Sequence, residues 1–121
     1  MQGGDSKLAQ LQNESLVCFD DLKDLGIKLS ASRASVAKKL SAAITSEMAL
    51  LAMPNAKLSV QVTTSDGSKP ENFSATGLDE VLFLFTSHTD GKLLPLAKAA
   101  SGGELSRVML SIEVVLAKNS P

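Results

Sequence analysis

The stretch that most constrains the fold is residues 100–107, in which a serine, two glycines and a glutamate open a run of helical apolar periodicity. Ser101 is a suitable helix N-cap, and Glu104, three residues later, completes the pattern of a capping box. The apolar residues that follow recur at the spacing of one helix face, and they are Leu105, Val108, Met109, Ile112, Val115 and Leu116. The sequence therefore predicts an amphipathic helix that begins after Ser101.

The glycine pair adds a property that a helix cap does not require. Because Gly102 and Gly103 have no Cβ atoms, a ligand can approach their backbone closely. Their N–H groups belong to the first turn, at the positive end of the helix dipole, and have no partner within the helix. Such a helix start suits an anion, phosphate above all, although serine-capped helices with two flexible glycines also occur in many proteins.

The string ASGGELSRVML at residues 100–110 resembles the signature motif of ABC-type ATPases, in the form found in RecN, a bacterial DNA repair protein related to the SMC proteins. Residues 95–98 resemble the segment that leads into this signature. A third pattern is similar to the RecN segment in which the returning coiled-coil arm re-enters the ATPase head, and it consists of Leu29, Ser30, Arg33, Ala37, Leu40, Ile44, Met48, Leu51, Met53, Pro54, Ala56, Val60 and Val62. Together these matches cover about residues 29–118.

The chain departs from the family pattern at residues 87–91. RecN-type proteins usually carry a Thr-Asn-Pro-Gly loop after the second strand of this region, whereas this chain has Ser-His-Thr-Asp-Gly. Any role of that loop is therefore not carried over to this chain. His88, the single histidine, has no second metal ligand or nucleophile nearby in sequence, which favours an exposed loop histidine.

The resemblance implies an α+β fold in which part of a coiled-coil arm joins part of an ATPase head. On this interpretation residues 1–28 form an N-terminal arm helix, and residues 29–54 form the arm helix that enters the head. Residues 55–121 form a partial head lobe, with an antiparallel hairpin of two strands and the signature helix.

The periodicity of the arm region predicts two separate helices. From residue 7 to residue 25 a seven-residue alternation predicts the first helix, and Gly26 fits its C-terminal cap. The second helix is expected to begin at Ser30 or Ser32 and to end at Met53, because Pro54 follows.

The periodicity of the head region predicts two strands and a loop. Residues 57–63 alternate like a half-buried strand, and the polar residues 64–77 predict a mobile loop. The second strand, residues 79–86, is apolar on both faces, so it is expected to be covered on both sides or to lie centrally in the sheet.

Two elements that hold nucleotide in ATPases of this class are missing from the sequence. The chain has no G-x-x-x-x-G-K-[ST] pattern to wrap the phosphates, and no apolar strand that ends in Asp-Glu to hold magnesium. The resemblance implies that the signature of one head closes over ATP held by the P-loop of a second head, as in a homodimer of the parent protein. The chain is therefore interpreted as a fragment that needs other parts of the parent to bind ATP with Mg²⁺, and we expect no ATPase activity from it alone.

The resemblance also implies roles for the signature residues. Ser101 would offer its hydroxyl, and Gly102 and Gly103 their N–H groups, to the γ-phosphate of ATP bound by the other head. Glu104 would cap the helix and contact ribose or the partner, and Arg107, one turn further, would reach phosphate, the partner or solvent. No residue of the chain is assigned a catalytic role or a metal.

The composition limits the partners of the chain. Twelve basic and thirteen acidic residues give a net charge of −1, which by itself predicts no strong attraction to nucleic acid. One cysteine, Cys18, excludes an internal disulfide and fits a reducing compartment. Because no apolar run reaches transmembrane length and no leader is visible, the expected location is cytoplasmic, without a membrane partner. The resemblance to RecN implies in addition an association with the nucleoid.

Three functions stay open at this point. The first is the signature lobe of a RecN-like ATPase in DNA double-strand break repair and recombination. The second is a non-enzymatic, SMC-like coiled-coil dimerisation module, whose self-association would not depend on ATP. The third is a DNA-binding module that uses the basic segment 28–57, where five basic side chains, Lys28, Arg33, Lys38, Lys39 and Lys57, accompany one acidic residue, Glu47. The third predicts DNA binding with a marked salt dependence.

Overall fold

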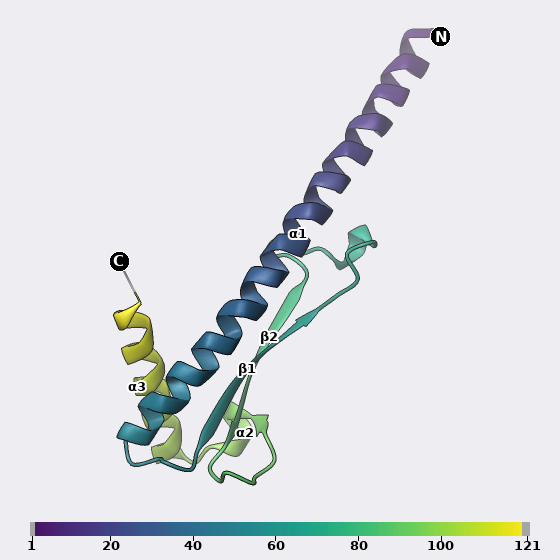
Figure 1. Cartoon of the computed structure of the whole chain (residues 1–121). Helices are drawn as coiled ribbons and strands as arrows, with labels where there is room; N and C mark the ends of the chain where they lie inside the picture. Colours follow the sequence, from purple (N-terminus) through teal and green to yellow (C-terminus); the bar gives the residue numbers. More distant parts are fainter. Residues whose placement is uncertain (1, 120–121) are drawn as a thin grey trace. The chain divides into compact units, whose positions relative to one another are not determined.

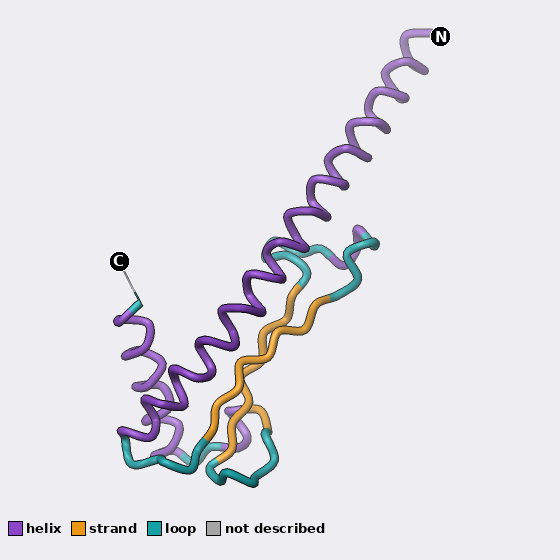
Figure 2. Tube along the Cα trace, in the orientation of Figure 1, coloured by secondary structure: helices purple, strands orange, loops and turns teal. Residues whose placement is uncertain are grey.

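The computed structural model describes residues 2–119 and has the expected α+β fold (Figures 1 and 2). The elements are α1 (Gln2–Leu50), β1 (Lys57–Thr64), the 3-10 helix η1 (Pro70–Asn72), β2 (Asp79–Thr86), β3 (Leu94–Pro95), α2 (Leu96–Ala99) and α3 (Gly102–Lys118). They form two compact units. The first comprises Met1–Ser32 and Thr64–Asp79, and the second comprises Arg33–Thr63 and Glu80–Pro121.

Helix α1 continues through the positions at which the sequence predicts a break. The predictions that Gly26 ends one helix and that Ser30 or Ser32 begins another are therefore wrong. Gly26 is buried in the helix interior, and a Cβ atom there would lie 2.7 Å from Cε1 of Phe73. The glycine allows the close approach of another segment and does not end the helix.

The C-terminal end of α1 lies three residues earlier than the sequence predicts. The helix ends at Leu50 rather than at Met53, and Ala52 adopts a left-handed conformation with φ of 64°. The N–H of Met53 donates to the carbonyl oxygen of Met48 at 3.1 Å, which is the long hydrogen bond of a Schellman motif. This motif ends the helix before Pro54 can do so.

The three strands form an antiparallel sheet in the order β1-β2-β3. Leu84 pairs with Pro95 and Phe85 with Leu94. The predicted bounds of β2 are confirmed, those of β1 are extended by one residue, and the central place of β2 is also confirmed. The expectation that β2 is covered on both sides fails for Val81 and Leu82, which are 50% and 41% exposed, because the core of the second unit covers only the C-terminal half of the strand.

The core of the second unit is built from α1, the sheet and α3, and its buried members are Ile44, Met48, Met53, Ala56, Leu58, Phe85, Leu96, Val108 and Val115. Most residues of the predicted apolar face of α3 are buried or partly buried. Met109 and Leu116 are the exceptions, because about half of each is exposed. Ser111 is fully buried on this face and donates its hydroxyl to the carbonyl of Arg107 at 2.9 Å. The small hydroxyl side chain thus takes a core position that apolar periodicity alone does not indicate.

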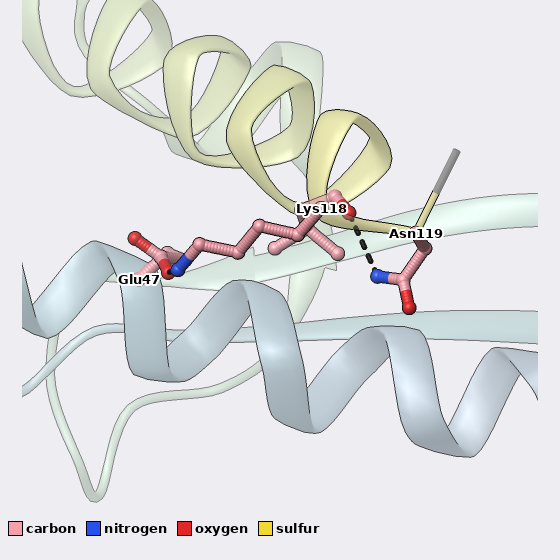
Figure 3. Close-up of polar contacts among 4 residues, drawn as sticks. Glu47, Lys118 and Asn119 are labelled. Carbon is pink, nitrogen blue, oxygen red and sulfur yellow. Dashed lines mark hydrogen bonds and ion pairs between the residues drawn. The ribbon is translucent and has the colours of Figure 1, made fainter. Parts of the chain in front are cut away.

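The C-terminal end of α3 is held against α1 by a charged contact. The Nζ atom of Lys118 forms an ion pair with the carboxylate of Glu47 (Figure 3). Asn119 follows as the C-cap, and its side-chain amide donates to the carbonyl of Val115 at 2.8 Å. Together with the buried valines these contacts fix α3 at both its middle and its end.

Two hydroxyl side chains of α1 bind the backbone of the edge strand β1. Ser41 Oγ accepts a hydrogen bond from the N–H of Val60 at 2.8 Å, and it donates to the carbonyl of Ala37 at 2.7 Å. Thr45 Oγ1 accepts from the N–H of Leu58 at 3.1 Å. Exposed edge strands offer such N–H groups to strands of other chains, so the two hydroxyls protect this part of the edge and attach the helix to the sheet.

The segment between β1 and β2 is the polar loop that the sequence predicts, but it contains local structure. Asp66 Oδ1 accepts from the N–H and the hydroxyl of Ser68, at 2.9 and 2.7 Å, and these bonds lower the pKa of Asp66. The backbones of Ser74 and Gly77 bond to each other in both directions, at 3.0 and 3.1 Å. At the end of the loop Leu78 is buried. The loop is therefore closed by its own hydrogen bonds.

Candidate functional site

Helix α3 begins with the capping box that the sequence predicts. Ser101 is the N-cap, and its hydroxyl oxygen accepts from the N–H of Glu104 at 3.4 Å. In return the N–H of Ser101 donates to Oε1 of Glu104 at 3.1 Å. The first bond within the helix follows at once, from the N–H of Leu105 to the carbonyl of Ser101 at 2.8 Å. The reciprocal cap holds the first turn in one conformation.

The two glycines of this first turn are open to solvent. A Cβ atom on Gly102 would have no heavy atom within 4 Å, apart from its own chain neighbours and helix backbone. A Cβ atom on Gly103 would meet only Nη2 of Arg107, at 3.6 Å. The glycine with a positive φ in the described chain is Gly77, so neither member of the pair is needed for a left-handed conformation. Packing among residues 2–119 therefore gives no reason for glycine at these two positions.

The carboxylate of Glu104 is ionised at neutral pH. The hydrogen bond from the backbone N–H of Ser101 lowers its pKa most, and burial, the second largest effect, raises it. The Ser101 hydroxyl, Arg107 and His88 each lower it by a smaller amount. Glu104 is thus an acceptor that is already engaged by its own helix cap. The polar hydrogen-bond donors that the first turn offers to a ligand are the Ser101 hydroxyl and the N–H groups of the two glycines.

Arg107 lies beside the glycine pair. Its Nη2 atom is the group closest to the position of a Cβ on Gly103, and its side chain is exposed. The structure therefore brings together Ser101, Gly103, Glu104 and Arg107, four of the five residues that the sequence assigns to the site, and Gly102 lies next to them in the same turn. A guanidinium group placed here adds positive charge to the donor groups of the helix start.

A hollow of about 340 Å³ adjoins the helix start. Glu104 and Arg107 line it from α3, and residues 52–56 and 87–88 line it from two loops. His88 is exposed in its loop, as predicted. Sequence reasoning missed the contribution of Asn55 and Ser87, because both come from loops that are far from the signature along the chain and carry no motif of their own.

A second, larger hollow of about 550 Å³ runs along β1 and the C-terminal part of α1. Lys38 lines it from the helix and Lys57 from the start of β1, together with Asn55 and Thr89. Among the basic side chains of segment 28–57, these two lysines are the ones that line one groove. Among the described residues, no Asp or Glu lines this groove.

Residues 2–119 hold no group of three or more histidine, cysteine, aspartate or glutamate side chains that is placed to bind a metal ion. Cys18 is exposed and not part of a disulfide. No helix in the same range is both long enough and apolar enough to cross a membrane.

Comparison with known proteins relates the chain to one group of curated proteins, although no family model matches it. The DNA repair protein RecN of Mycobacterium tuberculosis is 40% identical over an alignment of 122 positions, which covers 91% of this chain and 21% of that protein. RecN of Streptomyces coelicolor is 39% identical over 108 residues, which cover 84% of this chain and 19% of that protein. RecN of Haemophilus influenzae is 37% identical over 102 residues, which cover 84% of this chain and 18% of that protein. The chain thus spans about a fifth of the length of the curated relatives it matches.

Proposed function

The chain belongs to the RecN-type DNA repair proteins over the segment that it covers, and we propose that it acts in DNA repair as the signature-bearing part of an ATPase head. In this function the start of α3 contacts ATP that a second head of the dimeric parent protein holds with Mg²⁺. The chain does not hydrolyse ATP alone. The parent protein acts on DNA in double-strand break repair and recombination.

The observation that supports this function most is the unexplained glycine pair of α3. A Cβ atom added at Gly102 or Gly103 would clash with no atom of the described residues, and neither glycine needs a positive φ. Glycine in a helix is less stable than alanine by up to about 1 kcal/mol per residue. A ligand that must approach the backbone of the first turn gives these residues a function that offsets this cost.

The chemistry of the first turn suits the γ-phosphate of a nucleotide. The capping box uses the Ser101 oxygen as an acceptor, and the hydroxyl proton can turn from the Glu104 carboxylate to donate to a phosphate. The N–H groups of Gly102 and Gly103 and the guanidinium of Arg107 supply further donors and positive charge on the same turn. These groups bind and orient phosphate and stabilise its charge, whereas the attacking water and the metal are held by the other head.

A mixing experiment tests this function. This chain is added to a RecN-type head that has a working P-loop but a damaged signature, and ATP hydrolysis is measured. Ser101→Asp keeps an N-cap of equal quality but replaces the donor with a negative charge that repels phosphate. Ser101→Thr keeps both the cap and the hydroxyl.

We expect hydrolysis to appear on mixing with the unmodified chain and with Ser101→Thr, and to be lost with Ser101→Asp although that variant unfolds at an unchanged temperature. Loss of a donor of this kind typically lowers the rate about 100-fold or more. Equal stimulation by the chain and by Ser101→Asp would show that the motif serves only as a helix cap.

A second candidate function, DNA binding, is favoured by the groove along β1. Lys38 and Lys57 line it without an acidic neighbour, and the phosphates of nucleic acid complement such a charge. Two phosphate contacts predict that the logarithm of the binding constant falls with the logarithm of salt concentration with a slope of about −1.8.

This candidate is tested with a DNA duplex, the double variant K38A/K57A and the control Lys98→Ala, which removes an exposed lysine of α2 outside the groove. We expect the double variant to lose the salt-dependent part of binding and the control to retain it. Binding that is equally weakened in both would reflect only the total charge of the chain.

A further inference from the structure

Gly26 is an intrinsic weak point in the interior of the 49-residue helix α1. Glycine lowers helix stability there relative to alanine because it has more conformational freedom to lose. In the structure this position is buried against the loop that joins β1 to β2. Cε1 of Phe73 lies 2.7 Å from the place of a Cβ atom on Gly26, and Cδ1 of Leu78 lies 3.3 Å from it. Because Cβ contacts under 3.0 Å are essentially never seen, any larger residue at this position would displace Phe73.

Further contacts follow the same face of α1. The ring of Phe73 packs edge to face against Phe19, with centroids 6.1 Å apart and an interplanar angle of 87°. Nζ of Lys23 lies 5.8 Å from the centroid of Phe19, and Cγ of Lys23 lies 3.8 Å from the place of a Cβ atom on Gly67 in the loop. Residues 19, 23 and 26 are three or four apart, so they lie on one stripe of the helix. The loop therefore contacts α1 along about two turns that end at the weak point, and not at a single atom.

The loop presents these apolar groups from a preformed frame. The N–H of Ser65 donates to the carbonyl of Leu78 at 3.0 Å and closes the base of the loop, and Ser74 and Gly77 bond to each other near its tip. Figure 1 shows the loop beside α1 within the first unit. The loop's own hydrogen bonds do not involve α1, but packing on the helix shields them from water, so its amides exchange faster when the loop leaves α1.

We propose that residues 64–79 form a strap that locks α1 across Gly26. With the strap closed, Phe73 fills the notch left by the glycine and the helix is continuous. With the strap open, the notch is exposed to water and the helix opens most readily at this point. The strap thus couples the conformation of the loop between β1 and β2 to the continuity of α1. This coupling does not depend on the nucleotide site.

Amide hydrogen exchange of the full 121-residue chain tests the strap. Four variants are compared: Gly26→Ala, Phe73→Ala, the double variant G26A/F73A, and the control Gly4→Ala, which replaces a glycine of the same helix that has no other segment within 4 Å. The strap is followed at the hydrogen-bonded amides of Ser65, Phe73 and Gly77. The helix is followed at the amides of residues 26–30.

We expect Gly26→Ala to speed exchange at the strap amides although alanine favours the helix, and Gly4→Ala to leave them unchanged. Phe73→Ala should speed exchange at both the strap and residues 26–30. The double variant should slow exchange at residues 26–30 about fivefold relative to Phe73→Ala, because alanine is the better helix former and no ring is left to displace.

Two results would overturn the strap. One is wild-type protection of the strap amides in Gly26→Ala, which would mean that Phe73 does not occupy the notch. The other is unchanged exchange at residues 26–30 in Phe73→Ala, which would mean that the loop rests on the helix without supporting it. If Phe73→Ala unfolds the chain, Phe73→Leu provides the same comparison with a smaller apolar group, and its circular dichroism spectrum reports whether the helices are retained.

Discussion

At the scale of the residue, the hydroxyls of Ser41 and Thr45 join α1 to β1 more specifically than the apolar core does. Ser41 Oγ accepts from the backbone N–H of Val60, and Thr45 Oγ1 accepts from the backbone N–H of Leu58. Removing a hydroxyl leaves that N–H without its partner, which costs about 1–3 kcal/mol when the group is buried.

We therefore expect Thr45→Val, which preserves the side-chain shape, to lower the free energy of unfolding by about 1–3 kcal/mol in urea titrations. Ser41→Ala should act in the same direction, with a smaller net loss because alanine favours the helix. The control is Ser46→Ala, an exposed serine of the same helix, which should be neutral or slightly stabilising. A Thr45→Val variant as stable as the parent would show that water replaces the hydroxyl at this edge.

The left-handed Ala52 is a second feature of single residues. Its φ of 64° places an alanine where glycine is usual in a Schellman motif, and for residues with a Cβ atom this conformation costs about 1–2 kcal/mol. Glycine would remove that cost but would add freedom to the unfolded chain.

We expect Ala52→Gly to raise the free energy of unfolding by about 0.5–1 kcal/mol, measured by denaturant titration. Ala49→Gly, in the same helix three residues earlier, provides the matched control and should lower it by a similar amount. Destabilisation by both substitutions would mean that the left-handed alanine is held without strain.

At the scale of the element, α3 could be predicted from local sequence because its start depends on residues within one turn of each other. Ser101 and Glu104 are three residues apart, and their reciprocal hydrogen bonds are the ones that this spacing predicts. Continuity of α1 could not be predicted in the same way. A glycine that follows a helical stripe has the pattern of a helix end, whereas at Gly26 the deciding contact comes from Phe73, which lies far away along the chain.

The candidate site also has one part that local sequence predicts and another part that it does not. Its signature residues are contiguous and were found from the sequence, but the loops that complete the adjoining hollow carry no motif. The buried Ser111 was missed for a related reason, because a serine bonded to its own helix carbonyl fills a core position without an apolar side chain.

The capping box of α3 predicts a pH dependence of stability. The pKa of Glu104 is lowered in the folded chain, chiefly by the N–H of Ser101, so its ionised form is the one that the fold stabilises. This contribution is fully present above the ordinary pKa of 4.5 and is lost as pH falls through the lowered value.

Glu104→Gln keeps the capping pattern but cannot ionise. We expect the parent chain to be the more stable of the two at pH 7, and the difference to shrink toward zero as the pH falls from the ordinary pKa of 4.5 through the lowered one, in urea titrations at several pH values. A difference that is constant across this range would assign the effect of the substitution to geometry and not to charge.

At the scale of the whole molecule, α1 carries an apolar stripe that the described chain leaves exposed. Leu8, Leu11, Leu22 and Leu25 follow the seven-residue alternation of a coiled coil, and each is between 43% and 64% exposed. The strap contacts a neighbouring face, through Phe19 and Gly26. The stripe thus remains available to another helix, which is the observation that supports the dimerisation module among the functions considered.

We expect the chain to self-associate with increasing concentration, in the presence or absence of ATP, as measured by sedimentation equilibrium. The double variant L22E/L25E should weaken this association about 100-fold or more, because each buried leucine contributes about 1.5–3 kcal/mol and each 1.4 kcal/mol is a factor of ten. Leu116→Glu, which changes a half-exposed leucine of α3, provides the control and should associate like the parent chain. If Leu116→Glu abolished association instead, the contact would lie on the second unit, and the stripe of α1 would need a helix from elsewhere in the parent protein to cover it.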